Sequence, residues 1–429
     1  MMAERLAMVL RGAAECVTQP ELESLLEAKA EPTAYVGFEP SGLLHAGSLV
    51  PMLKVRDLIS AGFRVTVLLA DWHGFINNKL GSDWDALRAG VEYQRQMFGA
   101  FAPGAEFQTA SELVRSDGYW EMVLRVAKAT SLKRMRRALS IMGRNEDEAD
   151  SDTSMFFYPA MQATDIYALK VDLALGGMDQ RHAHMLARDA AEKLRLPKIV
   201  ALHTPLLGSL SGPGRMDTDS KMSKSDPTGA LLVHDSAKQL QKKLSKAFCP
   251  PERKGNPVLD IWEHLLAPAL GDVTIDRPEK FGGPVAFNDY AALEAACAGG
   301  GLHPLDLKNG TAAALDRLFE PMRAAVAAEP GPYDALTAAL ADCRRRLPLR
   351  RRHIALRWNR SGDFGDPLTQ RPQFGAAPRV GQRRRELREL AHQPLGGAQV
   401  PGFEMDCQRV SLRERLHDVL LAPVSQLEP

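Results

Sequence analysis

The chain has 429 residues, which is enough for two domains with a substantial buried core. Its formal net charge is only +1, so any binding of nucleic acid has to come from local basic patches and not from bulk charge. The five cysteines are scattered without a CxxC pair or a metal-ligand spacing, which argues against structural disulfides and zinc and favours a cytoplasmic address. The first 12 residues are too acidic for a signal peptide, and no apolar stretch reaches transmembrane length.

Residues 1–33 are expected to form a helical leader, and residues 34–235 alternate apolar runs with helical patterns. The expected strands are 34–38, 64–70, 106–108, 171–174 and 198–202. The first two enclose a helical pattern that begins near Ser48, and two strands around a helix form a βαβ unit. The sequence therefore predicts an α/β domain with a parallel sheet over 34–235.

Residues 236–343 differ, because they are Ala/Leu-rich helical segments broken by Pro and Gly. A separate helical domain is the economical interpretation, with helices near 236–248, 257–270 and 311–328. Residues 344–429 contain no lysine, carry clusters of arginine, and are rich in Pro, Gly and Gln. This tail is predicted to be mostly disordered.

Two motifs, far apart in the chain, are suited to contact phosphate. His45-Ala46-Gly47-Ser48 follows the first strand and a turn, where a helix N-terminus offers unpaired N–H groups and its dipole. Lys221-Met222-Ser223-Lys224-Ser225 places two flexible positive charges on a loop. Alone, a histidine or a Lys/Ser loop is most often an ordinary surface feature. In this order and at this separation, the two motifs predict that the chain handles ATP phosphates at two places.

A polar stripe lies in the second half of the first domain. Tyr158, Gln162 and Asp165 have the i, i+4, i+7 spacing of one helical face. Such a stripe can be a solvated face, but the neighbouring Met161 and Ile166 are apolar and favour a largely buried helix.

With these residues in view, the chain resembles a class I aminoacyl-tRNA synthetase, and more closely the tyrosyl-tRNA synthetases of archaea and eukaryotes. The similar stretches are residues 35–48, 68–75, 106–108, 158–188, 221–225, 277–283 and 302–309. The resemblance implies a Rossmann-type catalytic domain, a helical anticodon-binding domain and usually a homodimer. It also implies ATP-dependent activation of tyrosine to tyrosyl-adenylate, followed by transfer to the terminal ribose of tRNA(Tyr).

The resemblance implies tyrosine-binding roles for Tyr35, His73, Gln108, Tyr158, Gln162, Asp165 and Gln180. Tyr35 and Asp165 would hold the substrate hydroxyl, which fits the need of a buried phenol for a donor and an acceptor. Tyr158, Gln162 and Gln180 would bind the α-amino end.

For ATP, the resemblance implies contacts from Gly37, His45, Gly47, Gly177, Asp179, Lys221 and Lys224. His45, Lys221 and Lys224 would be the catalytic residues, because the reaction needs positioning and charge stabilisation and no covalent enzyme intermediate. Mg²⁺ is expected to arrive with ATP, and no dedicated metal site is expected in the protein. Ser48 departs from the second histidine that many class I enzymes carry, and it keeps a hydroxyl and a good helix-start residue.

Two surfaces are candidates for tRNA. Arg136 and Arg137 belong to a basic helical run that would attract the phosphates of an acceptor stem, although such a run is usually a solvated face. The resemblance places Phe281 and Asp306 at the first anticodon base, where an aromatic ring can stack a splayed base and a carboxylate can accept its donors.

Three alternatives remain open at this point. The chain could be an auxiliary synthetase copy that delivers an activated amino acid elsewhere, or a tRNA-binding relative that has lost catalysis. A small nucleotidyltransferase with an HxGH-type motif is the third. Intact His45, Gln180, Lys221 and Lys224 argue against lost catalysis, and the long loop and the helical domain argue against the small enzyme.

Overall fold

The computed structural model describes residues 2–143, 152–212, 222, 229–271, 273–343 and 345. All of them lie within one compact unit, which ends at Arg357. Lys221, Lys224 and nearly all of the arginine-rich tail lie outside the described residues, as does the side chain of Phe281. Among the helices that the structure describes, none is long and apolar enough to cross a membrane.

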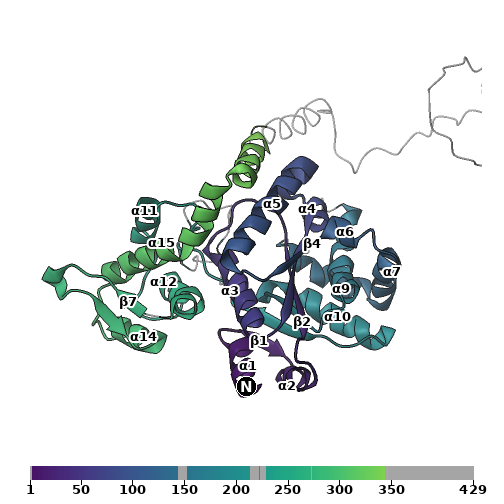
Figure 1. Ribbon diagram of the computed structural model, residues 1–429, viewed down its shortest axis with the longest axis horizontal. Coiled ribbons are helices and arrows are strands. Elements are labelled where there is room, and N and C mark those ends of the chain that lie inside the picture. Colours follow the sequence, from purple (N-terminus) through teal and green to yellow (C-terminus); the bar gives the residue numbers. More distant parts are fainter. Residues whose placement is uncertain are drawn as a thin grey trace, which may run out of the picture. The chain divides into compact units, whose positions relative to one another are not determined.

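A six-stranded sheet with the order β1-β6-β5-β2-β3-β4 forms the centre (Figure 1). The strands are β1 (Glu15–Val17), β2 (Thr33–Phe38), β3 (Arg64–Leu69), β4 (Glu106–Thr109), β5 (Leu173–Gly177) and β6 (Val200–Thr204). Strands β2 to β6 run parallel, and the chain order reverses between β2 and β5. In open α/β sheets, ligands bind beyond the carboxyl ends of the strands at such a reversal. The predicted α/β fold is confirmed, and its geometry places a site at β2 and β5.

Helices cover both faces of this sheet, so its strands are apolar on both sides. Alternate residues of β2 face opposite cores: Val36 packs with α3 (Ala46–Ser60) and α5 (Trp84–Phe101), and Tyr35 packs with the other core. That second core contains residues of α7 (Tyr119–Ala129), α9 (Tyr158–Ala168) and α10 (Arg181–Leu194). The period of two along a strand is what divides the side chains between the two cores.

Shorter helices connect these elements. They are α4 (Asp71–Ile76), η1 (Lys79–Ser82), α6 (Ala110–Leu113), α8 (Leu132–Ala138), η2 (Leu139–Met142), η3 (Thr153–Phe156) and η4 (Met178–Gln180).

The N-terminal leader is not purely helical. It has α1 (Met2–Leu10) and α2 (Gln19–Ala28), where Thr18 and Glu21 form a capping box. Between these helices, β1 pairs antiparallel with β6 and extends the sheet. A strand of three residues is too short to show a periodic pattern, which is why the sequence did not predict β1.

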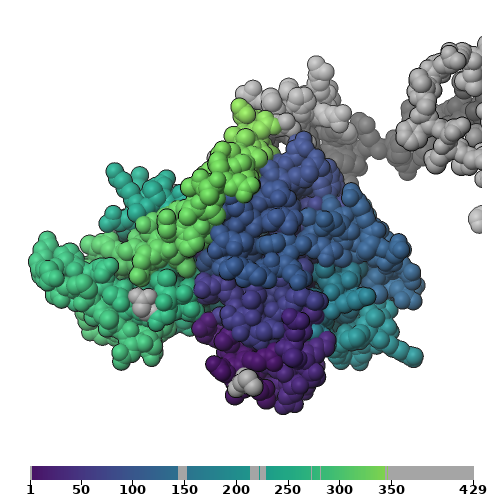
Figure 2. Space-filling view, in the orientation of Figure 1, coloured from purple at the N-terminus to yellow at the C-terminus, as the bar shows by residue number. Residues whose placement is uncertain are grey.

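The part after residue 235 is mainly helical and packs directly against the first part. Its elements are α11 (Ala237–Ser245), α12 (Pro257–Ile261), η5 (Trp262–Leu266), α13 (Ala267–Leu270), η6 (Glu279–Phe281), α14 (Tyr290–Ala298) and α15 (Pro304–Ala328). A hairpin of β7 (Val273–Ile275) and β8 (Val285–Phe287) was not predicted. Helix α15 packs against α11 and α5, and Figure 2 shows green C-terminal helices beside blue α5. The boundary at residue 235 remains a prediction, because these contacts join both parts in one unit.

Candidate functional site

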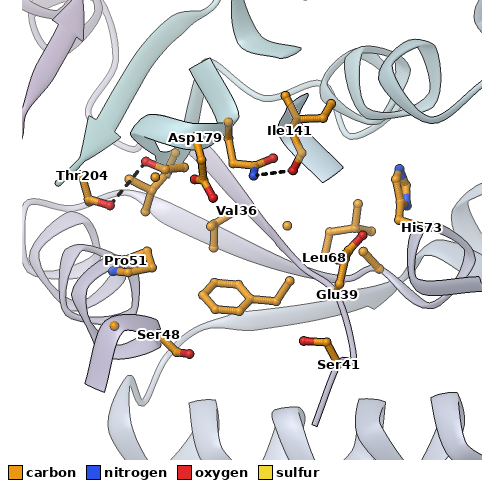
Figure 3. A pocket seen from close by; sticks show the side chains of 18 of the residues that line it. Val36, Glu39, Ser41, Ser48, Pro51, Leu68, His73, Ile141, Asp179 and Thr204 are labelled. Carbon is orange, nitrogen blue, oxygen red and sulfur yellow. Dashed lines mark hydrogen bonds between the residues drawn. The ribbon is translucent and has the colours of Figure 1, made fainter. Parts of the chain in front are cut away.

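A cavity of about 420 Å³ lies at the carboxyl ends of the central strands, a size typical of small-molecule sites. The candidate residues that line it are Tyr35, Gly37, His45, Gly47, His73, Tyr158, Gln162, Asp165, Gly177, Asp179 and Gln180. In Figure 3, His73 stands at one end of the cavity, and Ser48 and Pro51 stand at the other. The structure therefore brings together segments of the chain as distant as His45 and Gln180.

One end of the cavity holds a buried carboxylate, Asp165, which is 1% exposed. Its Oδ2 lies 3.1 Å from His73 Nε2, and its Oδ1 accepts a hydrogen bond of 2.6 Å from the Tyr119 hydroxyl. Burial alone lowers the pKa of His73, but the negative charges of Asp165, Glu39 and Asp71 outweigh burial and raise it. The carboxylate of Asp165 thus favours the protonated form of the neighbouring His73 ring.

Tyr35 is buried beside this carboxylate. Burial, together with the negative charge of Asp165, raises the pKa of Tyr35, so its hydroxyl stays protonated. Tyr35 therefore offers a hydroxyl donor, and Asp165 offers carboxylate oxygens as acceptors. That pair can bind a hydroxyl group that enters the cavity.

Glu39 forms a second carboxylate centre on the cavity wall. The Tyr158 hydroxyl donates to its Oε1 at 2.7 Å, and Asn77 Nδ2 donates to the same atom at 2.9 Å. Lys79 Nζ lies 3.6 Å from Oε2. Glu39 thus orients Tyr158, while Lys79 balances the charge of the carboxylate.

Two glutamines continue the polar wall. Gln162 Nε2 donates to Gln180 Oε1 at 3.1 Å, and Gln180 Nε2 donates to the Ile141 carbonyl at 3.2 Å. Helix α9 carries Tyr158, Gln162 and Asp165 toward the cavity, while most of its other residues are buried. The prediction of a largely buried helix is confirmed.

The other end of the cavity is formed by tight backbone. His45 is the N-cap residue of α3, and a Cβ atom on Gly47 would lie 2.9 Å from its Cε1. A Cβ atom on Gly177 would lie 2.6 Å from Asp179 Oδ1. Glycine at both positions leaves room for a ligand close to backbone N–H groups at a helix start, an arrangement that binds anions.

The second phosphate motif reaches the same cavity through Met222. This residue lines the cavity, is 3% exposed, and donates its N–H to the Leu207 carbonyl at 2.7 Å. The roles predicted for Lys221 and Lys224 lie outside the described residues.

Gln108 is not among the residues that line the cavity. It lies on the edge strand β4, opposite Leu68 of β3, so one strand separates it from β2. Leu68 itself lines the cavity. The predicted contact of Gln108 with tyrosine stays a prediction.

Sequence reasoning also missed Tyr119 and Glu39. Tyr119 begins α7 and belongs to no motif, so nothing in the sequence pointed to it. Glu39 follows β2 directly, and its place at the carboxyl end of a parallel strand is a signal that could have identified it.

The predicted tRNA-binding residues lie apart from this cavity. Arg136 and Arg137 are exposed on α8 and line a second hollow with Leu132 and Lys133. Asp306 lies in the first turn of α15, and Phe281 ends η6. Their predicted contacts with RNA are not tested by these positions.

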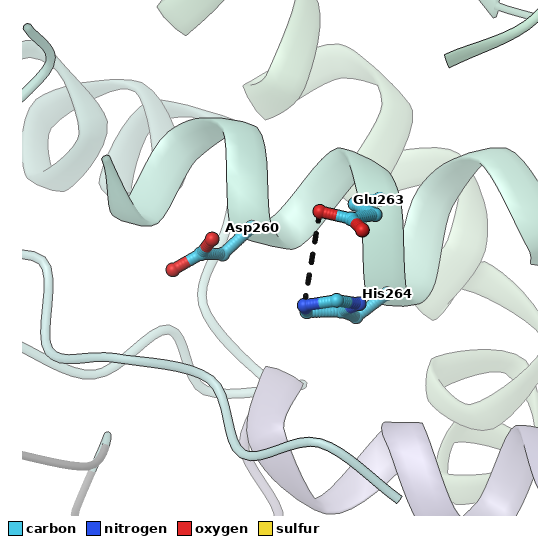
Figure 4. A group of neighbouring side chains, drawn as sticks. All are labelled: Asp260, Glu263 and His264. Carbon is cyan, nitrogen blue, oxygen red and sulfur yellow. Dashed lines mark ion pairs between the residues drawn. The ribbon is translucent and has the colours of Figure 1, made fainter. Parts of the chain in front are cut away.

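Among the described residues, Asp260, Glu263 and His264 have ligand atoms close enough to hold a metal ion (Figure 4). Arg253 Nε already donates to Glu263 Oε2 at 2.6 Å, so a metal would compete with a resident positive charge. Burial raises the pKa of Asp260 to about 6, which further weakens its capacity as an anionic ligand. We draw no metal site from this group.

A buried histidine pair supports the cavity from behind. His184 Nδ1 lies 3.0 Å from His203 Nε2, and His203 Nδ1 lies 2.9 Å from Glu15 Oε2. A Cβ atom on Gly176 would lie 3.0 Å from His184 Cε1, so the pair sits against the cavity wall. Burial, and then the neighbouring His203, lower the pKa of His184 to about 3.

This pKa predicts acid sensitivity. The pKa of His184 is about 3 in the folded state and 6.5 in the unfolded state, so the unfolded state binds more protons between pH 3 and pH 6.5. The stabilising effect of neutral His184 is therefore complete above pH 6.5 and is lost as the pH falls toward 3. We expect His184→Asn to reduce the pH slope of the unfolding free energy by roughly 1 kcal/mol per pH unit, measured by urea denaturation. His182→Asn, an exposed histidine on the same helix, should keep the slope, and equal slopes for both variants would contradict the assignment.

The family "tRNA synthetases class I (W and Y)" matches residues 27–320. The tyrosine–tRNA ligase of Aeropyrum pernix is 47% identical over 350 residues, which cover 78% of this chain and 96% of that protein. The crystal structure of that organism's tyrosyl-tRNA synthetase has a TM-score of 0.72 at 44% identity and covers 79% of this chain and 99% of its own. The tyrosyl-tRNA synthetase of Pyrococcus horikoshii, solved with L-tyrosine, has a TM-score of 0.72 at 37% identity. The match covers 79% of this chain and 100% of that one. The chain therefore belongs to the class I tRNA synthetases of the tryptophan and tyrosine type, and within them to the tyrosine–tRNA ligases.

Proposed function

We propose that this chain activates tyrosine with ATP and transfers the tyrosyl group to the terminal ribose of tRNA(Tyr). One observation carries the proposal: a single cavity joins the hydroxyl-binding pair Tyr35 and Asp165 to the glycine-containing helix start at His45. Relatives named tyrosine–tRNA ligase, and related structures solved with L-tyrosine, support the choice of substrate.

In this proposal, the tyrosine side chain enters toward Tyr35 and Asp165. Tyr158, Gln162 and Gln180 hold the amino end, and Glu39 orients Tyr158 through a hydrogen bond of 2.7 Å. The substrate carboxylate is then directed to the opposite end of the cavity. Held there, it is a nucleophile within reach of a bound triphosphate.

The chemical step is an in-line displacement at the α-phosphorus of ATP. A carboxylate oxygen forms the new bond to phosphorus, and the bond to the bridging oxygen breaks, so pyrophosphate leaves with its electron pair. His45, Lys221 and Lys224 stabilise the charge that moves onto the leaving group. Gly47 gives adenosine room, and Gly177 and Asp179 lie at the ribose. The 3′-terminal ribose of tRNA then takes the tyrosyl group and releases AMP.

Mg²⁺ would enter with ATP. Three carboxylates line the cavity among the described residues: Glu39, Asp165 and Asp179. Glu39 and Asp165 are already engaged by Tyr158 and His73. That arrangement fits an ion held mainly by the phosphates and its own waters, where it neutralises phosphate charge.

The direct test is amino-acid-dependent pyrophosphate exchange with all twenty amino acids, repeated with and without tRNA. Exchange that depends on tyrosine, followed by charging of tRNA(Tyr), supports the proposal. Exchange without charging of any tRNA would favour an auxiliary copy, and absence of exchange would favour a non-catalytic relative.

Helix α15 should read the anticodon in this enzyme, with Asp306 in its first turn. We expect Asp306→Asn to lower kcat/KM for tRNA charging by a factor that corresponds to about 1–3 kcal/mol, because one base contact is lost. Pyrophosphate exchange without tRNA should not change. Asp289→Asn is the matched control, because Asp289 caps the neighbouring helix α14. Equal damage to both reactions by Asp306→Asn would instead indicate a folding role.

We further propose that the enzyme is a cytoplasmic homodimer. Exposed apolar side chains gather on α7 and α8, where Trp120, Leu124 and Leu132 are 44%, 61% and 60% exposed. Apolar groups of this kind are typical of protein interfaces. None of the four cysteines in the described ranges forms a disulfide, which fits a reducing compartment. Sedimentation of the full chain tests the dimer.

A further inference from the structure

A short segment, residues 229–235, lies between the Lys221–Ser225 motif (KMSKS) and α11 and supports the turn that carries His45. Val233 N–H donates to the Leu44 carbonyl at 3.0 Å, and Ala46 N–H donates to the Leu231 carbonyl at 2.8 Å. His45 itself forms an antiparallel bridge with Leu232. The residues on both sides of His45 are therefore fixed by the 229–235 segment.

One arginine of α15 holds this segment in turn. Arg323 Nε donates to the Val233 carbonyl at 2.8 Å, and its Nη2 donates to the Asp235 carbonyl at 2.5 Å. Its Nη1 donates to Asp316 Oδ1 at 2.6 Å, and its guanidinium lies 5.6 Å from the centre of the Phe319 ring. The planar guanidinium thus joins two carbonyls of the segment in a fixed geometry, while Asp316 balances its charge.

A buried tyrosine makes a second connection from the segment to the same turn. Leu44 N–H donates to the Tyr93 hydroxyl oxygen at 3.2 Å, and that oxygen lies 2.9 Å from His234 Nε2. Burial, and then the charge of Arg323, lower the pKa of His234 to about 4. The ring is therefore neutral at pH 7, and it packs against Tyr333 with ring centres 4.5 Å apart.

We propose that Arg323 is a positioning residue for tyrosine activation, which acts by holding the 229–235 segment so that His45 stays aligned with the ATP phosphates. The inference rests on the proposed role of His45. Arg323 does not line the cavity, so it acts through the segment and not on the substrate. Its side chain is 21% exposed, so its bonds to two carbonyls are largely shielded from water.

The mechanism predicts a selective kinetic defect. Arg323→Lys keeps the charge but cannot reproduce the planar fork, so the segment and the His45 turn gain freedom. In tyrosine-dependent pyrophosphate exchange, we expect kcat/KM for ATP to fall between about tenfold and a hundredfold, because small misplacements of reacting groups are costly. The Kd for tyrosine, measured by equilibrium dialysis without ATP, should change by less than about twofold, because Tyr35 and Asp165 are untouched.

Controls separate positioning from stability. Arg253→Lys weakens a comparable ion pair, with Glu263, in the same helical part but does not contact the 229–235 segment. It should reproduce any loss of thermal stability without the defect toward ATP. If Arg323 had only a structural role, Arg323→Lys would lower Tm and leave kcat/KM for ATP of the folded enzyme unchanged. That result would overturn the proposal. If Arg323→Lys raised the Kd for tyrosine by the same factor by which it lowered kcat/KM for ATP, the proposal would be overturned as well.

Two further variants keep the proposal testable. Tyr93→Phe removes only the hydroxyl that joins Leu44 to His234, so it should give the same selective defect toward ATP. This variant replaces Arg323→Lys in the experiment if Arg323→Lys does not fold. His45→Asn tests the premise separately. If His45→Asn kept the activity of the wild type, the proposed phosphate role of His45 would be refuted. Activity that depends on His45, but not on Arg323 or Tyr93, would refute the positioning role alone.

Discussion

Replacing Asp165 by asparagine is expected to lower kcat/KM for tyrosine in pyrophosphate exchange by about 10- to 150-fold, because a hydrogen bond to a charged group contributes about 1.5–3 kcal/mol. The same change should alter kcat/KM for phenylalanine little, because phenylalanine has no hydroxyl to bind. Asparagine keeps an oxygen that can accept from Tyr119, which now donates to Asp165 Oδ1 at 2.6 Å, so the substitution removes the charge with little change of shape.

The underlying reason is the cost of unpaired polar groups. A site built to bind a hydroxyl leaves its own buried groups without partners when the substrate lacks one. Tyrosyl-tRNA synthetases as an enzyme class reject phenylalanine by about 10⁵-fold, and that magnitude is taken over from the class. Asp165→Asn should therefore narrow the preference for tyrosine over phenylalanine.

Asp172→Asn is the matched control for this experiment. Asp172 lies just before β5 and accepts hydrogen bonds from Lys29 and from the Thr33 backbone, and it does not line the cavity. Its replacement should leave the ratio of the two kcat/KM values unchanged. If Asp165→Asn also left that ratio unchanged, Asp165 would not hold the tyrosine hydroxyl, and the strongest argument for tyrosine would fall with it.

The sequence predicted the fold best where burial leaves a strong pattern. Most residues of strands β2 and β3 are apolar, with buried ones at their centres, and their positions agree with the predicted 34–38 and 64–70 to within a residue. Strand β1 and the β7–β8 hairpin were missed, because three residues carry too little periodicity.

For the site, the sequence predicted residues that share one element but not contacts between distant ones. Tyr158 and Asp165 share one helix, so their spacing showed that they point the same way. Tyr119 is 46 residues from its partner Asp165, and Glu39 is 119 residues from its partner Tyr158. Such contacts depend on the way strands and helices are arranged around the reversal of chain order between β2 and β5, which a single sequence does not reveal.

The second large effect concerns the KMSKS lysines. We expect Lys221→Ala or Lys224→Ala to lower kcat for tyrosine-dependent pyrophosphate exchange by about 10²- to 10³-fold, the typical loss when one group that stabilises transition-state charge is removed. The KM for tyrosine should stay nearly constant, because these lysines act on pyrophosphate as it leaves. Met222, between them in the motif, already lines the cavity and donates its N–H to Leu207, which ties the motif to the phosphate end of the site.

Lys242→Ala provides the control, because Lys242 is an exposed lysine on α11 and does not line the cavity. It removes the same charge from the chain, so it should reproduce any general electrostatic effect while leaving kcat intact. Single-turnover measurement of tyrosyl-adenylate formation separates the chemical step from product release. If Lys221→Ala and Lys224→Ala instead weakened tyrosine binding and left the rate of adenylate formation unchanged, the lysines would belong to the amino-acid site. A defect limited to the chemical step fits only groups that meet charge developing on the phosphates.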